Sequence, residues 1–388
     1  MILTASVLKS TDFWTGAFLY SREVVIVLRS TEEWRWHKGK QTSYNKKTKA
    51  NTMKERAITM KKLCKVAAAF LVCASVLTGC GSNEEKDSDK KIPVVSVAQI
   101  VEHKSLNTIR DSFKAEMEEL GYKDGENIKL DFKDAGGQQN TLNSIMSTFA
   151  GNKSDVIVAI ATPTAMSAAK YSKDIPIVFS AVSDPVSAGL MDDLNKPNNN
   201  ITGTSDEIQV DQILDLALQV NPDLKTLGFI YNSSEANSVS NLAKAKEFCE
   251  KHNIKLVEGS GANITEIQSA VSVLTDKCDA IFAPNDNTVA SSMSALVETA
   301  NKKKVPVYTG ADSMVSDGGF ATVGIDYTEL GKETARMTDQ ILKGEKVENM
   351  PVKVFKDNLN IYVNKKTMET LGITLPDAVK NSKNLVMM

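Results

Sequence analysis

Two stretches of the sequence place small polar residues directly after a short apolar run, where such residues can bind a ligand. The first is residues 162–164 (Thr-Pro-Thr) and the second is residues 285–288 (Asn-Asp-Asn-Thr). Each opens a helical stretch, so backbone N–H groups lie unpaired at the helix start and favour an anion such as a carboxylate. The spacing predicts two anion-binding strand ends, although Thr164 and Thr288 also suit the simpler role of capping a helix.

Both stretches belong to an internal repeat. Residues 155–164 and 175–178 of the first copy correspond to residues 279–288 and 305–308 of the second. The offset is 124 residues at the first strand and 130 at the next, so the second copy should carry a helix longer by six residues. Because open α/β sheets bind ligands at the carboxyl ends of their strands, two such copies facing one another make a cleft.

The elements that position these residues follow an alternating order. Short β-branched runs separate longer segments with apolar residues at helical spacing, which predicts alternating strands and helices. The expected strands are 94–100, 128–132, 156–160, 175–179, 227–231, 254–257, 280–283, 305–308 and 321–325, and the expected helices include 105–120, 238–251 and 329–342. Continuous apolarity indicates strands buried on both faces, hence an α/β fold of doubly wound parallel sheets.

The N-terminal part of the chain differs from the rest. Residues 60–79 join three lysines to the twelve-residue apolar run 66–77, which is typical of a secretory signal and shorter than the about 20 residues of a membrane span. The signal is followed by Cys80, and residues 80–91 have the polar composition of a flexible tether. Residues 1–59 have no place in such a signal, and we expect them to be a mis-annotated extension.

Charge is distributed unevenly along the chain. The formal net charge is -2, but from Cys80 onward 32 basic and 43 acidic residues give -11. This acidic body argues against a nucleic-acid partner, since phosphate binding needs basic patches. Cys249 and Cys278 lie in apolar patterns, which favours two buried thiols over a disulfide. The sequence shows no cluster of His and Cys, so we expect no metal and no cofactor.

Five short phrases resemble the substrate-binding lipoproteins of bacterial ABC importers, in the branch associated with tryptophan and tyrosine. They are residues 97–106 (VAQIVEHKSL), 161–165 (ATPTA), 179–185 (FSAVSDP), 231–238 (YNSSEANS) and 324–331 (GIDYTELG). The resemblance covers residues 92–375, and the Leu-Thr-Gly-Cys80 sequence resembles a lipobox. It implies lipidation of Cys80, cleavage before it, and a place on the extracytoplasmic face of the cell membrane.

The family resemblance also implies an architecture and a mechanism. The fold would be the type I periplasmic-binding fold, two similar doubly wound lobes joined by a three-strand hinge, with crossings near Gly203, Thr322 and Met350. The lobes would be residues 92–203 plus 323–349, and 204–322 plus 350–388. Such a protein, monomeric and not an enzyme, closes on a small ligand and delivers it to a permease driven by an ATPase.

An amino-acid ligand needs donors for its carboxylate, an acceptor for its ammonium and a slot for its side chain. We expect the carboxylate to bind Thr162, Thr164 and Ser180. The candidate ammonium acceptors are Asp184, Asp286, Asp312 and Asp326. Several of these carboxylates also suit helix capping or solvent exposure, so the sequence does not decide which of the four binds the ammonium.

Further polar residues should face the cleft because they follow strands at their carboxyl ends. In the first lobe they are Gln99, Glu102 and His103. In the second lobe they are Tyr231, Asn232, Glu235, Asn237, Ser238 and Asn287. Aromatic walls for a ligand ring are sought among Phe179, Tyr308 and Tyr327, although aromatic residues on strands are as often part of the core.

Two other functions stay open at this point. One is a sugar receptor on the same fold, which the scarcity of arginine and the lack of tryptophan after residue 80 weaken. The other is a lipid-anchored hydrolase, for which no G-x-S-x-G sequence is present. A nucleotide hydrolase is disfavoured too, since the chain lacks a GxxxxGK[ST] loop.

Overall fold

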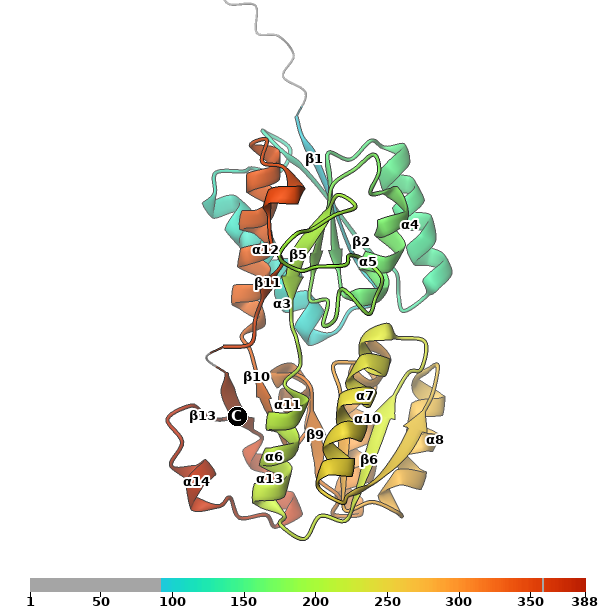
Figure 1. Cartoon of the computed structure of the whole chain (residues 1–388), viewed down its shortest axis with the longest axis vertical. Helices are drawn as coiled ribbons and strands as arrows, with labels where there is room; N and C mark the ends of the chain where they lie inside the picture. The colour runs from blue at the N-terminus through green and yellow to red at the C-terminus, as the bar shows by residue number, and fades with distance from the viewer. Residues whose placement is uncertain (1–91, 358) are drawn as a thin grey trace, which may run out of the picture. The chain divides into compact units, whose positions relative to one another are not determined.

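The first lobe contains a six-stranded parallel sheet, whose central strands are largely apolar (Figure 1). The computed structural model describes residues 92–357 and 359–388. In spatial order the strands are β11 (Lys353–Val354), β5 (Ile201–Ser205), β4 (Ile177–Ser180), β3 (Val156–Ile160), β1 (Val94–Gln99) and β2 (Lys129–Asp134). β3 and β4 are buried at every residue, as befits strands covered by helices on both faces.

The second lobe has a seven-stranded sheet. In spatial order its strands are β13 (Leu385–Met387), β12 (Asn360–Val363), β10 (Ala321–Gly324), β9 (Val307–Thr309), β8 (Ala280–Ala283), β6 (Thr226–Tyr231) and β7 (Lys255–Ser260). All neighbouring strands are parallel except β10 and β12. The expected doubly wound α/β fold is confirmed, with this one antiparallel pair added.

The internal repeat appears as a shared strand order. β2-β1-β3-β4-β5 in one sheet and β7-β6-β8-β9-β10 in the other both follow the order 2-1-3-4-5. In this order the chain reverses direction across the sheet between its first and third strands, and ligands bind at that point. In the first sheet this point lies between the ends of β1 and β3, and in the second sheet it lies between the ends of β6 and β8.

The helices cover these sheets. Those of the first lobe are α3 (Lys104–Glu119), α4 (Gln139–Gly151), α5 (Thr162–Ala168) and α12 (Tyr327–Leu342), with short 3-10 turns η1 (Ala169–Tyr171) and η2 (Val347–Asn349). Those of the second are α6 (Val210–Val220), α7 (Ala236–Lys251), α8 (Ile264–Thr275), α9 (Asn287–Ser291), α10 (Met293–Lys302), α11 (Asp312–Ser316), α13 (Lys365–Leu371) and α14 (Asp377–Lys380). The longer helix expected in the second copy is the pair α9 and α10.

The chain crosses between the sheets after β5, after β10 and after β11. The first two strands end at Ser205 and Gly324, two residues beyond the crossings expected near Gly203 and Thr322. The strand before the third crossing, β11, ends at Val354, four residues beyond the crossing expected near Met350. β11 pairs with β5 through Lys353 and Val354, so the first sheet holds the chain until this strand has ended.

Helix α12 is far from α3 in the sequence but lies beside it in the first lobe, as Figure 1 shows. Gly331 makes this approach possible, because a Cβ there would lie 2.6 Å from the Ile109 carbonyl oxygen and would also clash with Ser112 Oγ. An ion pair of 2.8 Å between Arg336 Nε and Glu116 Oε1 joins the same two helices. The second crossing therefore returns the chain to a firmly packed helix.

Several expectations concern residues before 92. The extension 1–59, the signal 60–79, the tether 80–91 and Cys80 all lie outside the described residues. In the part of the chain that is described, no helix has both the length and the apolar character needed to cross a bilayer. Cys249 and Cys278 are free buried thiols, and burial raises the pKa of each to about 11.

Candidate functional site

A cavity lies between the two lobes at the carboxyl ends of their strands. Its volume is about 20 Å³, room for about one water molecule, so a larger ligand needs the lobes to move apart. Residues from both lobes and from the first two crossings line it: His103, Ser105, Leu106, Ala161, Thr162, Ala181, Asp206, Asn237, Asn285, Asn287, Ala290, Ala311, Met314 and Tyr327. The strand order predicts this place, since it includes the direction-reversal points of both sheets.

Two alanines at the ends of β3 and β4 line the cavity from the first lobe. Ala161 and Ala181 have φ angles of 77° and 56°, in the left-handed region that residues other than glycine rarely adopt. Such conformations cost about 1–3 kcal/mol each and concentrate at ligand sites. Their one-carbon side chains leave space above two adjacent strands.

Asp206, directly after β5, is the one carboxylate among the described residues that line the cavity. Its Oδ1 accepts a hydrogen bond from Ser183 Oγ at 2.9 Å. Its Oδ2 accepts from Asn285 Nδ2 at 2.8 Å and from the Tyr327 hydroxyl at 2.9 Å. Burial raises the pKa of Asp206, and these hydrogen bonds lower it only in part. A ligand cation beside Asp206 would favour the ionised form of the carboxylate and lower its pKa.

A chain of hydrogen bonds crosses the cleft at the ends of β1 and β8. His103 Nε2 lies 3.2 Å from Asn287 Oδ1, and Asn287 Nδ2 donates to Glu235 Oε2 at 2.6 Å. Glu235 also accepts from the backbone N–H groups of Asn287 and Thr288, at 3.0 and 3.1 Å. Glu235 therefore orients Asn287 and is not itself among the residues that line the cavity.

Two cavity residues keep polar atoms free for a ligand. Asn237 is 3% exposed and donates from Nδ2 to the Asn285 carbonyl at 3.2 Å, while its Oδ1 has no partner in the described part of the chain. Thr162 is equally buried, and no described residue hydrogen-bonds its hydroxyl. A buried polar atom without a partner is costly, so Asn237 Oδ1 is the atom here that points to a bound group.

Two other expected site residues, Ser180 and Asp286, are engaged inside a lobe. The Ser180 hydroxyl is bonded to Thr334 Oγ1 at 2.8 Å beneath α12, and Ser180 is not among the residues that line the cavity. Asp286 accepts from the Asn232 N–H at 2.7 Å and from Ser238 Oγ at 2.6 Å, and it caps α9. Burial and nearby Glu235 raise the pKa of Asp286 well above its ordinary value. Its bonds are internal to the second lobe, and it is not among the residues that line the cavity.

The other candidate ammonium acceptors lie away from the cavity lining. Asp326 is exposed and caps α12, and Asp312 accepts from the Ser313 N–H at 2.7 Å, with a pKa raised by burial. Asp184 accepts from Ser240 Oγ at 2.7 Å, which ties the lobes together outside the cavity. Burial alone would raise the pKa of Asp184, but hydrogen bonds from Ser187 and Ser240 lower it.

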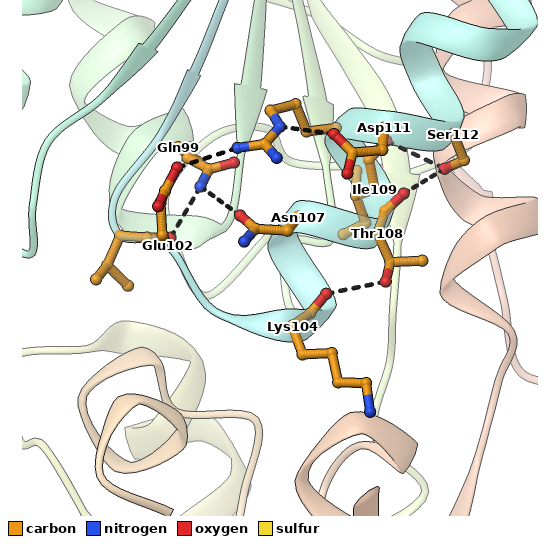
Figure 2. Close-up of polar contacts among 10 residues, drawn as sticks. Gln99, Glu102, Lys104, Asn107, Thr108, Ile109, Asp111 and Ser112 are labelled. Atoms are coloured by element: carbon orange, nitrogen blue, oxygen red, sulfur yellow. Dashed lines mark hydrogen bonds and ion pairs between the residues drawn. The ribbon is translucent and has the colours of Figure 1, made fainter. Parts of the chain in front are cut away.

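Of the three candidate site residues at the end of β1, one lines the cavity and two are bonded elsewhere (Figure 2). Gln99 turns its Nε2 to Asn107 Oδ1 at 2.9 Å rather than to the cavity. Glu102 is exposed and pairs with Arg110 Nη1 at 3.2 Å. Only His103 of the three lines the cavity. In the second lobe Asn232 donates to Thr288 Oγ1 at 2.9 Å and is not a lining residue, and Thr164 is buried within the first lobe.

The aromatic candidates divide between site and core. Tyr327 lines the cavity, and burial together with Asp206 raises the pKa of its hydroxyl well above the ordinary value. Phe179 and Tyr308 are fully buried core residues, and Tyr231 donates to Glu258 Oε2 at 2.9 Å on the outer side of β6. In residues 92–357 and 359–388, no cluster of His, Cys, Asp and Glu could hold a metal ion.

Sequence reasoning missed Asp206, Ser183 and Asn285. Asp206 follows β5, whose residues Ile-Thr-Gly-Thr-Ser do not form the continuous apolar run that marked the other strands. Asn285 was noted as part of the repeat, but its contact with Asp206 depends on how the lobes meet. The rule that polar residues directly after a parallel strand face the ligand site would have identified Asp206, had β5 been recognised as a strand.

The chain is similar to known proteins in both sequence and fold. The chain is 38% identical over 324 residues to the tyrosine-binding protein of Clostridioides difficile (strain R20291), covering 81% of this chain and 94% of that protein. It is also similar to the structure of an ABC domain in complex with L-Trp from Streptococcus pneumonia, at 37% identity and a TM-score of 0.72, covering 76% of this chain and 99% of that one.

A ligand-free, open substrate-binding protein from Clostridium difficile gives a useful contrast. It is 40% identical with the same coverage, yet its TM-score is only 0.59. The lower score means that this chain superposes less well on that open structure than on the L-Trp complex. The hydrogen bonds across the cleft agree with a closed form here. The sequence pattern described as ABC transporter substrate binding protein matches residues 94–386, and the chain belongs to this family, with its type I periplasmic-binding fold.

Proposed function

We propose that this protein captures an aromatic amino acid between its two lobes and delivers it to the permease of an ABC transporter. The ligand binds the open form, contacts both lobes only in the closed form, and so shifts the population toward closure. The protein acts as a monomer outside the cytoplasm and is a receptor rather than an enzyme. Its partners are the permease and ATPase subunits, which recognise the closed form.

The observation that carries the proposal is that Asp206 and Asn237 line the same cavity. Asp206 offers a carboxylate that burial leaves poorly solvated, and Asn237 offers an Oδ1 with no partner in the described residues. An ammonium group has three N–H donors and a positive charge, so it suits both acceptors. The Thr162 hydroxyl is available on the other side as a donor to the ligand carboxylate.

The ligand's side chain would lie in the less polar part of the cavity. Leu106 and Met314 line it from opposite lobes, and Ala161 and Ala181 leave space between them. Tyr327 adds an aromatic ring. The names of the two relatives, a tyrosine-binding protein and a complex with L-Trp, support an aromatic ligand for a site of this kind.

Binding is tested by thermal melting of the purified protein with a panel of amino acids, sugars and nucleosides. Tryptophan or tyrosine at a hundredfold excess over the dissociation constant should add about 2.7 kcal/mol of stability and raise the melting temperature by a few degrees. The Asp206→Asn variant should lose this shift, whereas Asp211→Asn, an exposed aspartate on α6, should keep it. A melt that responds to a sugar or nucleoside and not to amino acids contradicts the proposal.

The membrane location is tested separately. We propose that Cys80 carries a diacylglyceryl thioether and becomes the mature N-terminus. Mass spectrometry of the protein from its native membrane should find a lipid-modified peptide beginning at Cys80, and the Cys80→Ser variant should appear in the soluble fraction. Recovery of an unmodified Cys80 within a longer chain contradicts the anchor without touching the ligand proposal.

A further inference from the structure

The protonation of His103 follows from the hydrogen bonds beyond it. Glu235 accepts four hydrogen bonds, from the N–H groups of Asn287 and Thr288, from Thr288 Oγ1 and from Asn287 Nδ2. Since the side-chain amide of Asn287 donates to this carboxylate, its Oδ1 must be the end that faces His103. Oδ1 is an acceptor only, so the His103 Nε2 atom 3.2 Å away must carry the proton.

The second ring nitrogen of His103 is then a bare acceptor. Burial lowers the pKa of His103, an effect opposed only in part by Asn287, Asp317 and Asp134, so the ring stays neutral near pH 7. A neutral imidazole with its proton on Nε2 presents a lone pair at Nδ1. The ring lines the cavity, and no residue within 92–357 or 359–388 hydrogen-bonds Nδ1.

The strand order places this acceptor at the opposite side of the cavity from Asp206. His103 follows β1 and Asp206 follows β5, with β3 and β4 between them. Three strand spacings amount to about 14 Å. The two intervening strands end in Ala161 and Ala181, whose small side chains leave the way open. Because Asp206 and His103 line one cavity, an amino acid with its ammonium at Asp206 would direct its side chain toward His103.

We propose that His103 Nδ1 accepts a hydrogen bond from an N–H or O–H group on the ligand's side chain. The site then selects an indole or a phenol and disfavours a phenyl ring, which has no donor to offer. This inference rests on the proposed function and refines it, from aromatic amino acids in general to those with a polar hydrogen on the ring system. His103 thus has two roles, as it also bonds Asn287 across the cleft.

Two substitutions separate these roles. In His103→Gln the amide nitrogen can reach the place of Nε2 and still donate to Asn287, while the acceptor at Nδ1 is gone. In His103→Asn the shorter side chain keeps a polar atom near Nδ1 but cannot reach Asn287. His252→Gln is the matched control, because His252 stacks on Phe248 at the end of α7, away from the cavity.

Calorimetry with tryptophan, tyrosine, phenylalanine and 1-methyltryptophan gives the readout. The wild-type protein and His252→Gln should prefer tryptophan over both phenylalanine and 1-methyltryptophan by roughly tenfold, the effect of losing the hydrogen bond to Nδ1. In His103→Gln this preference should collapse, because tryptophan loses affinity and phenylalanine loses much less. In His103→Asn all four ligands should weaken together through the lost contact with Asn287.

The inference and the proposed function fail in different ways. If the wild-type protein binds none of these amino acids, the proposed function is wrong. If it binds them but holds phenylalanine as tightly as tryptophan, or if His103→Gln weakens both equally, the role of Nδ1 is overturned and the receptor stands. Long-range ¹H–¹⁵N NMR of the ring tests the tautomer directly: a proton on Nε2 supports the inference, and one on Nδ1 overturns it.

Discussion

Asn285 of the second lobe donates a hydrogen bond of 2.8 Å to the carboxylate of Asp206 at the first crossing. The same amide nitrogen donates to Ser183 Oγ, which follows β4 of the first lobe, at 2.7 Å. One side chain of the second lobe is thus bonded to two groups across the cleft. Because these bonds join the lobes, they form only on closure and stabilise the closed form selectively.

Asn285→Ala should therefore weaken ligand binding without touching the ligand's aromatic side chain. Losing two hydrogen bonds of about 1 kcal/mol each predicts a loss of affinity of roughly thirtyfold. Asn381→Ala, which changes an exposed residue after α14, serves as the control. Calorimetry measures both affinities, and equal affinities in the two variants would show that this contact does not contribute to closure.

Ala161→Gly tests the strained backbone at the cavity. Glycine relieves a left-handed conformation that costs about 1–3 kcal/mol, while its greater freedom when unfolded costs roughly 0.5–1 kcal/mol. The variant should be as stable as the wild type or more so by about 1 kcal/mol. Ala165→Gly, inside α5 with ordinary helical geometry, should be destabilised. Chemical denaturation measures both, and a destabilised Ala161→Gly would contradict the strain.

Gly331→Ala tests the approach of α12 to α3. Helix propensity alone favours alanine, but the new Cβ would press on the Ile109 carbonyl, so we expect a net loss of about 1–3 kcal/mol. Gly151 ends α4, and a Cβ added there would meet no atom within 4 Å. Gly151→Ala should accordingly be tolerated or stabilising. The prediction fails if thermal unfolding finds the two variants equally stable.

The lowered pKa of His103 predicts a pH dependence. Between its folded pKa and the ordinary value of about 6.5, the unfolded chain binds more protons than the folded one. The stabilising effect of the neutral ring is therefore present above about pH 6.5 and is lost as the pH falls through the lowered pKa. His103→Gln should remove this component. Urea unfolding at about pH 7.5 and about pH 5.5 checks it, and an identical loss of stability in both proteins would contradict it.

The strands and the lobe repeat could be predicted because continuous apolar runs have one interpretation in an α/β chain. The strand ending at Ser205 escaped because threonine, glycine and serine interrupt its apolar pattern. The site was predicted only in part, and Ser180 shows why. The sequence indicates which strand ends meet at the cleft. It does not indicate which polar side chains there already have a hydrogen-bond partner, as the Ser180 hydroxyl has in Thr334 of α12.

Contacts between the lobes were beyond sequence reasoning for a related reason. His103 and Asn237 were identified from their places after strands, and both line the cavity. Asp206 owes its position to a crossing, and its partners come from residues 23 and more positions away, on three different segments. No local pattern encodes such a meeting of segments, because it depends on the packing of both lobes.

The central claim is that a buried carboxylate at position 206 binds the ammonium group of an aromatic amino acid. Calorimetry of L-tryptophan and of N-acetyl-L-tryptophan, which lacks that charge, tests it most directly in the wild-type protein and in Asp206→Asn. We predict that acetylation abolishes binding to the wild type and that Asp206→Asn weakens L-tryptophan by about a hundredfold or more, as expected for a buried charge pair left incomplete. Equal affinity of the wild type for the two ligands would contradict the account.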